Sequence, residues 1–104
     1  GLELNLPRES GGARHVYHLY VIETAKRDQV LNSLRNRGVM AQVHYPVGVH
    51  LQKCYQTLGY RKGEFPAAER AADRILSIPM FAELTAEQIE YSAHTLINIL
   101  DDII

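Results

Sequence analysis

The feature that most restricts the fold of this chain is an amphipathic segment near residue 90 that has both a helix start signal and a long apolar stripe. Thr85 and Gln88 have the spacing of a capping box, in which each side chain hydrogen-bonds the backbone of the other residue. The apolar residues that follow recur at helical spacing: Ile89, Ala93, Leu96, Ile97 and Leu100. Because a helix with such a stripe must bury it, the rest of the chain has to supply a second layer.

Three segments have the composition of β-strands and can form that layer. Residues 16–22 are β-branched and aromatic, and both alternating sets are largely apolar, which predicts a strand covered on both faces. Residues 40–45 predict a second strand. Residues 77–80 predict a short third strand, which Pro79 places at a sheet edge because proline cannot donate a ladder hydrogen bond. We therefore expect a small three-stranded mixed or antiparallel sheet.

Helical patterns lie between these strands. Residues 24–38 predict a helix that ends at Gly38, with this glycine in the left-handed conformation. Residues 50–58 place their apolar side chains on one stripe and predict another helix, and Pro66 is suited to the first position of a further one. The expected order is β-α-β-α-α-β-α, an α+β fold with helices covering the sheet. Ferredoxin-like modules use a related alternation, and the pattern alone leaves them open.

Size and charge exclude several classes of protein. A chain of 104 residues fits one domain with a modest core. The net charge is −1 and the basic residues are dispersed, so no sequence-independent nucleic-acid surface is predicted. No apolar stretch is long enough to cross a bilayer, so no membrane partner is predicted.

The polar, glycine-containing residues 1–13 predict a linker or interdomain segment, which leaves residues 14–104 as the folded domain. Cys54 is the single cysteine, so no internal disulfide can form and a reducing compartment, by default the cytoplasm, is expected. Because Cys54 lies on an apolar helix face, we expect a buried and inert thiol.

The run VHYPVGVH, residues 43–50, predicts a rigid polar corner. Pro46 prevents the strand from continuing, and Gly48 allows a sharp turn before a helix that carries His50. Ligand-binding groups tend to lie on loops of this kind, at the end of a strand.

His44 and Tyr45 can each donate a hydrogen bond to a phosphate or sugar oxygen without a permanent charge. His50 would lie near a helix N-terminus, where free N–H groups attract anions. On pattern alone, a structural role is favoured for His44, and a capping or solvated role is equally open for His50. Because the two histidines are six residues apart, they match neither helical metal ligands nor a zinc pattern, and no metal site is predicted.

Five blocks of sequence occur in a characteristic order: YHLYVI, RNRGV, VHYPVGVHLQKCYQTLGY, FPAAERAADRILSIPMF and LTAEQI. Over residues 14–100 the chain resembles the C-terminal domain of DegT/DnrJ/EryC1/StrS sugar aminotransferases, which are pyridoxal-phosphate enzymes of the aspartate aminotransferase fold type. The resemblance implies the small domain of that fold, with the HYP segment facing the cleft between a small and a large domain. It makes His44 and Tyr45 substrate-facing candidates, with His50 next, and assigns none of them as the central acid–base group.

The resemblance also implies what lies outside this chain. In the family the lysine that holds pyridoxal phosphate belongs to a larger N-terminal domain, and the full-length enzyme is a homodimer that transfers an amino group from glutamate to a keto sugar on a nucleotide. The three lysines here are Lys26, Lys53 and Lys62, in polar surroundings without the desolvation that activates a Schiff-base amine. We therefore expect no bound cofactor and no transaminase activity from this chain alone.

Two other classes of function stay open. One is a free-standing binding or protein-interaction module that has lost its catalytic domain. The other is a regulatory small-molecule domain of ferredoxin-like topology.

Overall fold

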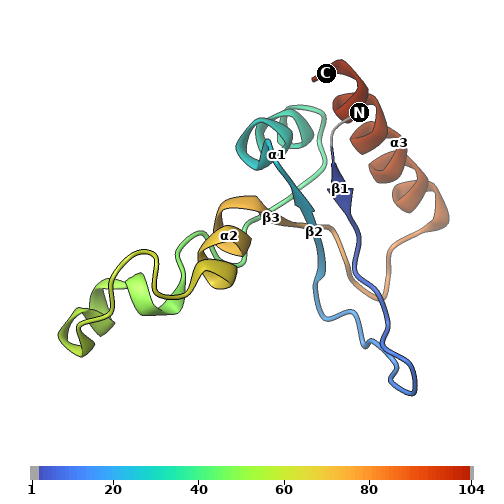
Figure 1. Ribbon diagram of the computed structural model, residues 1–104. Helices are drawn as coiled ribbons and strands as arrows, with labels where there is room; N and C mark the ends of the chain where they lie inside the picture. Colours follow the sequence, from blue (N-terminus) through green and yellow to red (C-terminus); the bar gives the residue numbers. More distant parts are fainter. Residues whose placement is uncertain (1–2, 104) are drawn as a thin grey trace.

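The computed structural model describes residues 3–103 and shows a three-stranded antiparallel sheet with helices packed beside it (Figure 1). The strand order is β1-β2-β3, with β2 in the centre. The expected α+β class, a small sheet covered by helices, is confirmed. The elements in chain order are β1 (Leu4–Asn5), β2 (Tyr20–Thr24), α1 (Arg27–Asn36), the 3₁₀ helices η1 (Val49–Leu51) and η2 (Lys53–Leu58), α2 (Pro66–Arg74), β3 (Ile75–Ile78) and α3 (Ala86–Asp102).

The first two strands differ in extent from the prediction. β2 begins at Tyr20, four residues after the predicted start of the strand 16–22. β1 comes from the segment that was expected to be a linker, and its Leu4 pairs with Thr24 of β2. Part of residues 1–13 is therefore sheet, while the division of the chain at residue 13 stays a prediction.

β3 pairs antiparallel with β2, with Ser77 opposite Val21. It starts two residues before the predicted range 77–80 and ends at Ile78. The following Pro79 has no N–H for the ladder. β3 is the last strand in the order β1-β2-β3, so the predicted edge position is confirmed.

The predicted strand 40–45 is wrong. Only Gln42 pairs, through a single antiparallel bridge to Ser77 in which each backbone N–H donates to the other residue's carbonyl, at 3.0 and 2.7 Å. Beyond this bridge the segment forms no further ladder with β3, and Pro46 has no N–H with which to extend one. The element order therefore begins with two consecutive strands and departs from β-α-β-α-α-β-α.

The end of α1 follows the prediction closely. Gly38 has φ +80°, and its N–H donates to Arg35 O at 3.0 Å. The Val39 N–H donates to Leu34 O at 2.9 Å, which completes a Schellman motif. Val39 is thereby returned to the core beneath the helix that it follows.

One apolar core joins the sheet to α1 and α3. Its buried members are Ile22, Val30, Leu31, Leu34, Val39, Ala41, Leu76, Leu96, Ile99 and Leu100. The capping box at the start of α3 is confirmed, with both reciprocal hydrogen bonds present. The predicted stripe of α3 is partly wrong, because Ile99 is buried while Ile89 and Ile97 are half exposed along an open groove beside the sheet.

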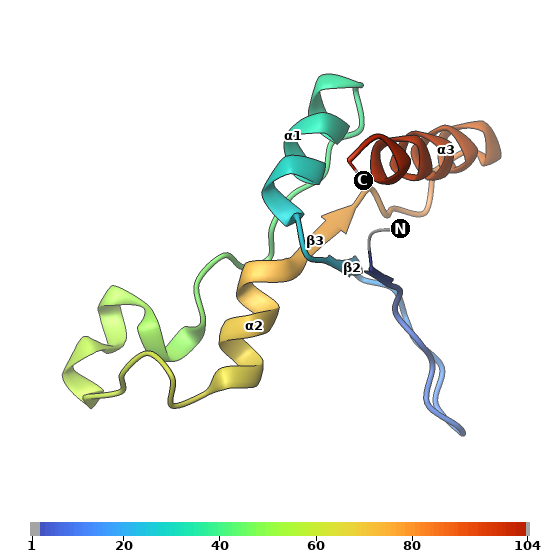
Figure 2. The ribbon, with the colours of Figure 1, turned by 45° about the horizontal axis from the view of Figure 1, so that its top comes forward.

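Residues 47–65, here called the arm, project away from this body (Figures 1 and 2). The predicted helix 50–58 is instead the pair η1 and η2, joined at Gln52, whose backbone is extended. The radius of gyration is 15.5 Å, whereas a compact chain of this length has about 13 Å. The helix predicted to begin at Pro66 is confirmed as α2, which returns the chain from the arm to β3.

Candidate functional site

His44 is fixed in place by the sheet. The bridge at Gln42 holds the backbone beside β3, and the His44 Nδ1 lies 2.9 Å from the hydroxyl of buried Ser77. Because Nδ1 is occupied by this hydrogen bond, the other ring nitrogen, Nε2, is the atom available to a ligand. His44 is half buried, so the ring is oriented by the protein and still reachable.

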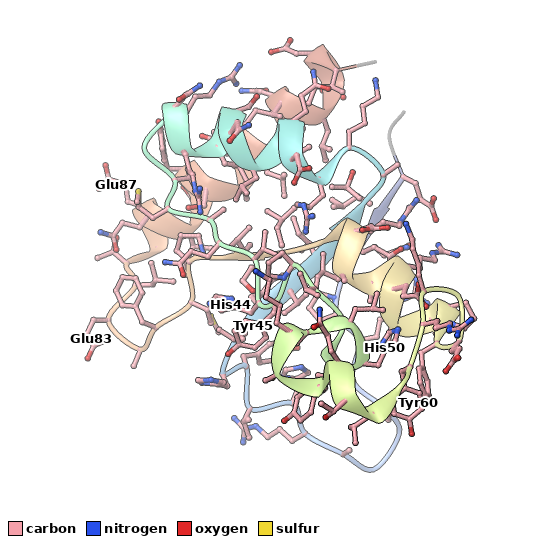
Figure 3. The ribbon with its side chains drawn as sticks, turned by 90° about the vertical axis from the view of Figure 1, so that its left-hand side faces the viewer. His44, Tyr45, His50, Tyr60, Glu83 and Glu87 are labelled. Carbon is pink, nitrogen blue, oxygen red and sulfur yellow. The ribbon has the colours of Figure 1, made fainter. Side chains whose placement is uncertain are left out.

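Tyr45 lies next to His44 on the surface (Figure 3). The two rings meet edge to face, with centroids 5.6 Å apart, and the peptide bond between the two residues is cis. Tyr45 is 69% exposed. The structure thus brings the two predicted residues together, with one ring anchored and one phenol open to solvent.

The third predicted residue, His50, turns into the arm. Its side chain is 8% exposed, and its Nε2 lies 3.3 Å from Glu69 Oε2, close enough for an ion pair but not aligned for a hydrogen bond. Its ring centroid lies 4.8 Å from that of Phe65. A Cβ on Gly48 would lie 3.0 Å from Cε1 of the His50 ring, so a larger residue at this position would require the imidazole to shift by a few tenths of an ångström.

Sequence reasoning did not single out Glu69, which connects α2 to the arm. The Gly63 N–H lies 2.8 and 2.9 Å from the two carboxylate oxygens, and the Phe65 N–H donates to Oε2 at 3.2 Å. The hydrogen bond from Gly63 is the main cause that lowers the pKa of Glu69, and the contacts with Phe65 and His50 add to it against the effect of burial. The sequence did contain a signal for Glu69, an acidic residue in the first turn of the helix that begins at Pro66. This helix has no side-chain cap.

The chain has three lysines that could in principle hold a cofactor. Lys26, Lys53 and Lys62 are all exposed, and they lie before α1, in η2 and in the turn before α2. A Schiff-base lysine needs an enclosed, desolvated amine. The described residues therefore do not fit covalent attachment of pyridoxal phosphate by this chain itself.

Within residues 3–103, no group of three or more His, Cys, Asp or Glu side chains is placed to bind a metal ion. None of the helices in this range has the length and apolarity to span a bilayer. Cys54 is exposed, which corrects the expected burial, because the segment that carries it is a 3₁₀ helix on the arm and not a helix packed on the core.

Comparison with known families gives a match along almost the whole chain. The profile of the DegT/DnrJ/EryC1/StrS aminotransferase family matches residues 2–97. The chain belongs to this family. Its three-stranded antiparallel sheet with helices resembles the C-terminal small domain of these aminotransferases.

Individual relatives agree with this assignment. The chain is 45% identical, over 82% of its length, to a pleiotropic regulatory protein of Geobacillus stearothermophilus. It is 39% identical, over 86% of its length, to a UDP-N-acetyl-3-dehydro-alpha-D-glucosamine 3-aminotransferase of Acidithiobacillus ferrooxidans. These alignments span 23% and 24% of the relatives, so the chain covers about a quarter of their length.

Solved structures give the same result. The fold superposes on S. venezuelae DesV, solved in complex with a ketimine intermediate, with a TM-score of 0.83 and 29% identity over 95% of this chain and 26% of that one. It superposes on a DegT DnrJ EryC1 StrS aminotransferase from Brucella abortus with a TM-score of 0.83 and 26% identity, over 91% and 26% of the two chains. The likeness therefore reaches the small sheet, its helices and most of the loops between them.

Proposed function

We propose that this chain is the C-terminal small domain of a pyridoxal-phosphate-dependent sugar-nucleotide aminotransferase. The observation with the most weight is that the family profile matches nearly all of the chain while the chain covers only a quarter of its relatives. A larger N-terminal domain would then hold the cofactor. The exposure of all three lysines supports this division of labour.

In the complete enzyme, glutamate donates the amino group and a keto sugar attached to a nucleotide receives it. The relative from Acidithiobacillus ferrooxidans, which is named for a UDP-linked amino sugar, supports this class of substrate. Pyridoxal phosphate supplies the electron sink, and the small domain helps to orient the substrate and exclude water. We further propose a homodimer of the full-length protein and, from its single cysteine, a reducing cytoplasmic setting.

His44 and Tyr45 are the residues proposed to position the sugar nucleotide. Ser77 fixes the His44 ring through Nδ1, which leaves Nε2 free to hydrogen-bond a sugar or phosphate oxygen. The Tyr45 hydroxyl, on a ring packed edge-on against His44, offers a second donor on the same surface. These contacts orient the substrate. In this proposal, residues of the cofactor-binding domain carry out the proton transfers of the reaction.

The substrate role predicted for His50 stays a prediction. Its Nε2 faces Glu69, which is an anion supplied by the chain itself. This position favours an indirect role, in which His50 supports the arm that follows the His44 and Tyr45 corner.

The test uses the full-length protein that contains this chain. We expect His44→Ala to weaken the use of the nucleotide sugar by about 1–3 kcal/mol, or roughly 5- to 150-fold in kcat/KM, because a polar partner is left unpaired. His94→Ala, an exposed histidine on α3, is the matched control and should leave kcat/KM unchanged. An unchanged kcat/KM for His44→Ala would remove this residue from the site.

A separate measurement tests whether the chain alone can hold the cofactor. After incubation with pyridoxal phosphate and borohydride reduction, mass spectrometry should detect no specific adduct on Lys26, Lys53 or Lys62. A single stoichiometric adduct on one of them would overturn the proposed division between the two domains.

A second candidate function is a free-standing interaction module that has lost its catalytic domain. The exposed apolar residues of the arm favour it, because unpaired apolar patches mark sites of protein contact. The reading frame upstream of residue 1 separates the two candidates. A contiguous cofactor-binding domain would support the aminotransferase, and a native start codon at that point would support the module.

A further inference from the structure

Ser77 contacts the segment that carries His44 through both its backbone and its side chain. The Ser77 N–H donates to Gln42 O at 2.7 Å, and the Gln42 N–H donates to Ser77 O at 3.0 Å. The Ser77 hydroxyl lies 2.9 Å from the His44 Nδ1. The backbone pair therefore fixes where the corner lies, and the side-chain contact fixes the rotation of the imidazole.

The two sides of this contact are held by the fold. Ser77 lies in β3 opposite Val21 of the central strand, and it is only 4% exposed. The segment that leads to His44 is anchored at Ala41, which is fully buried and whose carbonyl accepts a hydrogen bond from Arg35 Nε at 2.9 Å. The hydroxyl and Nδ1 are thus kept at hydrogen-bond distance without a further loss of side-chain freedom.

Burial decides which of the two groups donates. Among residues 3–103, the Ser77 hydroxyl has no hydrogen-bond partner other than His44 Nδ1. If Nδ1 carried the proton, the hydroxyl would accept this bond, and its own hydrogen would be left without an acceptor in a buried site, which costs free energy. If the hydroxyl donates, its hydrogen and the Nδ1 lone pair are both used. The second arrangement is therefore favoured.

The proton of the neutral imidazole then lies on Nε2. This nitrogen has no hydrogen-bond partner among residues 3–103, and His44 is half buried, with the Tyr45 ring packed edge to face against it. An Nε2–H group donates to an oxygen acceptor and cannot accept from an ammonium or amide group. The corner is therefore suited to a carbonyl or phosphate oxygen.

We propose that Ser77 is a positioning residue of the candidate site, and that its hydroxyl holds His44 in the Nε2–H form. Ser77 acts through His44 and does not itself touch the substrate. Its effect on activity rests on the proposed function, in which the acceptor is an oxygen of the keto sugar or of the diphosphate. The hydrogen-bond arrangement of Ser77 and His44 is independent of that function.

The first experiment reads the position of the proton in the 104-residue chain. Long-range nitrogen–proton correlation spectra of the isotope-labelled chain distinguish the two ring nitrogens at about pH 8, where imidazole side chains are neutral. The signals of His44 are assigned by their loss in His44→Ala. We expect the proton on Nε2, and we expect Ser77→Ala to shift the Nδ1 resonance. A proton on Nδ1, or an Nδ1 resonance that ignores Ser77→Ala, would overturn the proposal.

The second experiment measures kinetics in the full-length protein that contains this chain. Ser77→Ala should raise KM for the nucleotide sugar about two- to tenfold with kcat nearly unchanged, because a contact made equally in the ground and transition states is weakened. Ser77→Thr, which keeps the hydroxyl, should retain most of the affinity. Circular dichroism confirms that each variant folds.

The double variant shows whether Ser77 acts through His44. In a His44→Ala background, Ser77→Ala should cause no further loss, because the group that it orients is already absent. A full additional loss in the double variant would assign Ser77 a role apart from His44 and would overturn the proposal.

Thr95→Val is the matched control. Thr95 is another buried hydroxyl residue, at 6% exposure, but it lies on α3. The change should leave KM and the His44 resonances as they are. Effects equal to those of Ser77→Ala would show only that the loss of a buried hydroxyl is felt throughout the domain, and this would also overturn the proposal.

Inhibition by UDP or dTDP identifies the acceptor, because both carry the diphosphate without the sugar. If Ser77→Ala raises the inhibition constant by the same factor as KM, His44 binds a phosphate oxygen. If it raises KM alone, His44 binds a sugar oxygen. Either result supports an Nε2–H donor. A full-length protein that does not aminate nucleotide sugars would instead refute the proposed function, and the proton position in the isolated chain would still decide the role of Ser77.

Discussion

The body and the arm of this chain are held together by different kinds of interaction. In the body, α1, α3, β2 and β3 share a core in which Ile22, Leu34 and Leu76 are fully buried. In the arm, the large apolar residues stay exposed, and one carboxylate, Glu69, fixes the backbone. The comparison shows that a surface can be shaped by polar contacts and still leave its apolar groups available to a partner.

The largest effect is expected from the core of the body. Leu34→Ala removes a fully buried side chain of α1 and should lower the free energy of unfolding by about 2–5 kcal/mol, from lost burial and the cavity that remains. Leu58→Ala, on the exposed arm, is the matched control and should change it by less than about 0.5 kcal/mol. Chemical denaturation followed by far-ultraviolet circular dichroism measures both. Equal losses would show that the arm belongs to the core.

The start of α3 gives the next effect in size. Thr85 Oγ1 accepts from the Gln88 N–H at 3.2 Å, and the Gln88 side chain accepts from the Thr85 N–H at 3.1 Å. Thr85→Ala removes one half of this capping box and should lower the free energy of unfolding by about 1 kcal/mol, while Thr85→Ser should retain most of it. The same denaturation experiment applies, and equal stability of the alanine and serine variants would refute a capping contribution.

Sequence signals succeeded where the determinants are local. The capping box at Thr85, the left-handed Gly38 and the helix start at Pro66 each depend on neighbouring residues, and all three are confirmed. The short strand Leu4–Asn5 was missed because two residues in a polar segment show no periodicity, and it exists only through pairing with β2.

In the candidate site, too, sequence patterns reveal neighbours along the chain but not partners that are distant in sequence. The HYP motif identified His44 and Tyr45 as neighbours at a chain corner, and the structure places their rings together. The partner that orients His44 is Ser77, which is 33 residues away, so no local pattern could reveal it. The exposure of Ile89 and Ile97 was likewise beyond the apolar pattern, which predicts a helical stripe but not how much of it the sheet covers.

Two carboxylates make the stability of the chain depend on pH, Glu23 in the body and Glu69 in the arm. In the body, burial raises the pKa of Glu23, but hydrogen bonds from Arg74 and Arg70 outweigh it and leave the pKa below its ordinary value. In the arm, the pKa of Glu69 is lowered chiefly by the hydrogen bond from Gly63. Because the pKa of each carboxyl group is lower in the folded state, each group contributes fully to the free energy of unfolding above the ordinary pKa of 4.5. That contribution is lost as the pH falls through the folded-state pKa.

We therefore expect the arm to loosen progressively below about pH 4.5, before the core of the body unfolds. Amide hydrogen exchange, read by nuclear magnetic resonance, should show protection lost at residues 63 and 65 while amides of α1 and α3 stay protected. Simultaneous loss of protection in both regions would contradict a separately held arm.

Glu69→Gln perturbs the arm at neutral pH and leaves the body unchanged, so it should have the smallest effect on the global free energy of unfolding. The amide group puts an NH₂ donor where the Gly63 and Phe65 N–H groups need an acceptor, so one or both lose their partner. We expect exchange at these two amides to accelerate about tenfold or more, with the unfolding midpoint of the body unchanged and the acid dependence of the arm abolished. Glu64→Gln, an exposed carboxylate in the same turn, is the matched control and should alter neither amide. If Glu69→Gln and Glu64→Gln behave alike, a single carboxylate does not hold the arm, and its shape must come from the packing of His50 against Phe65.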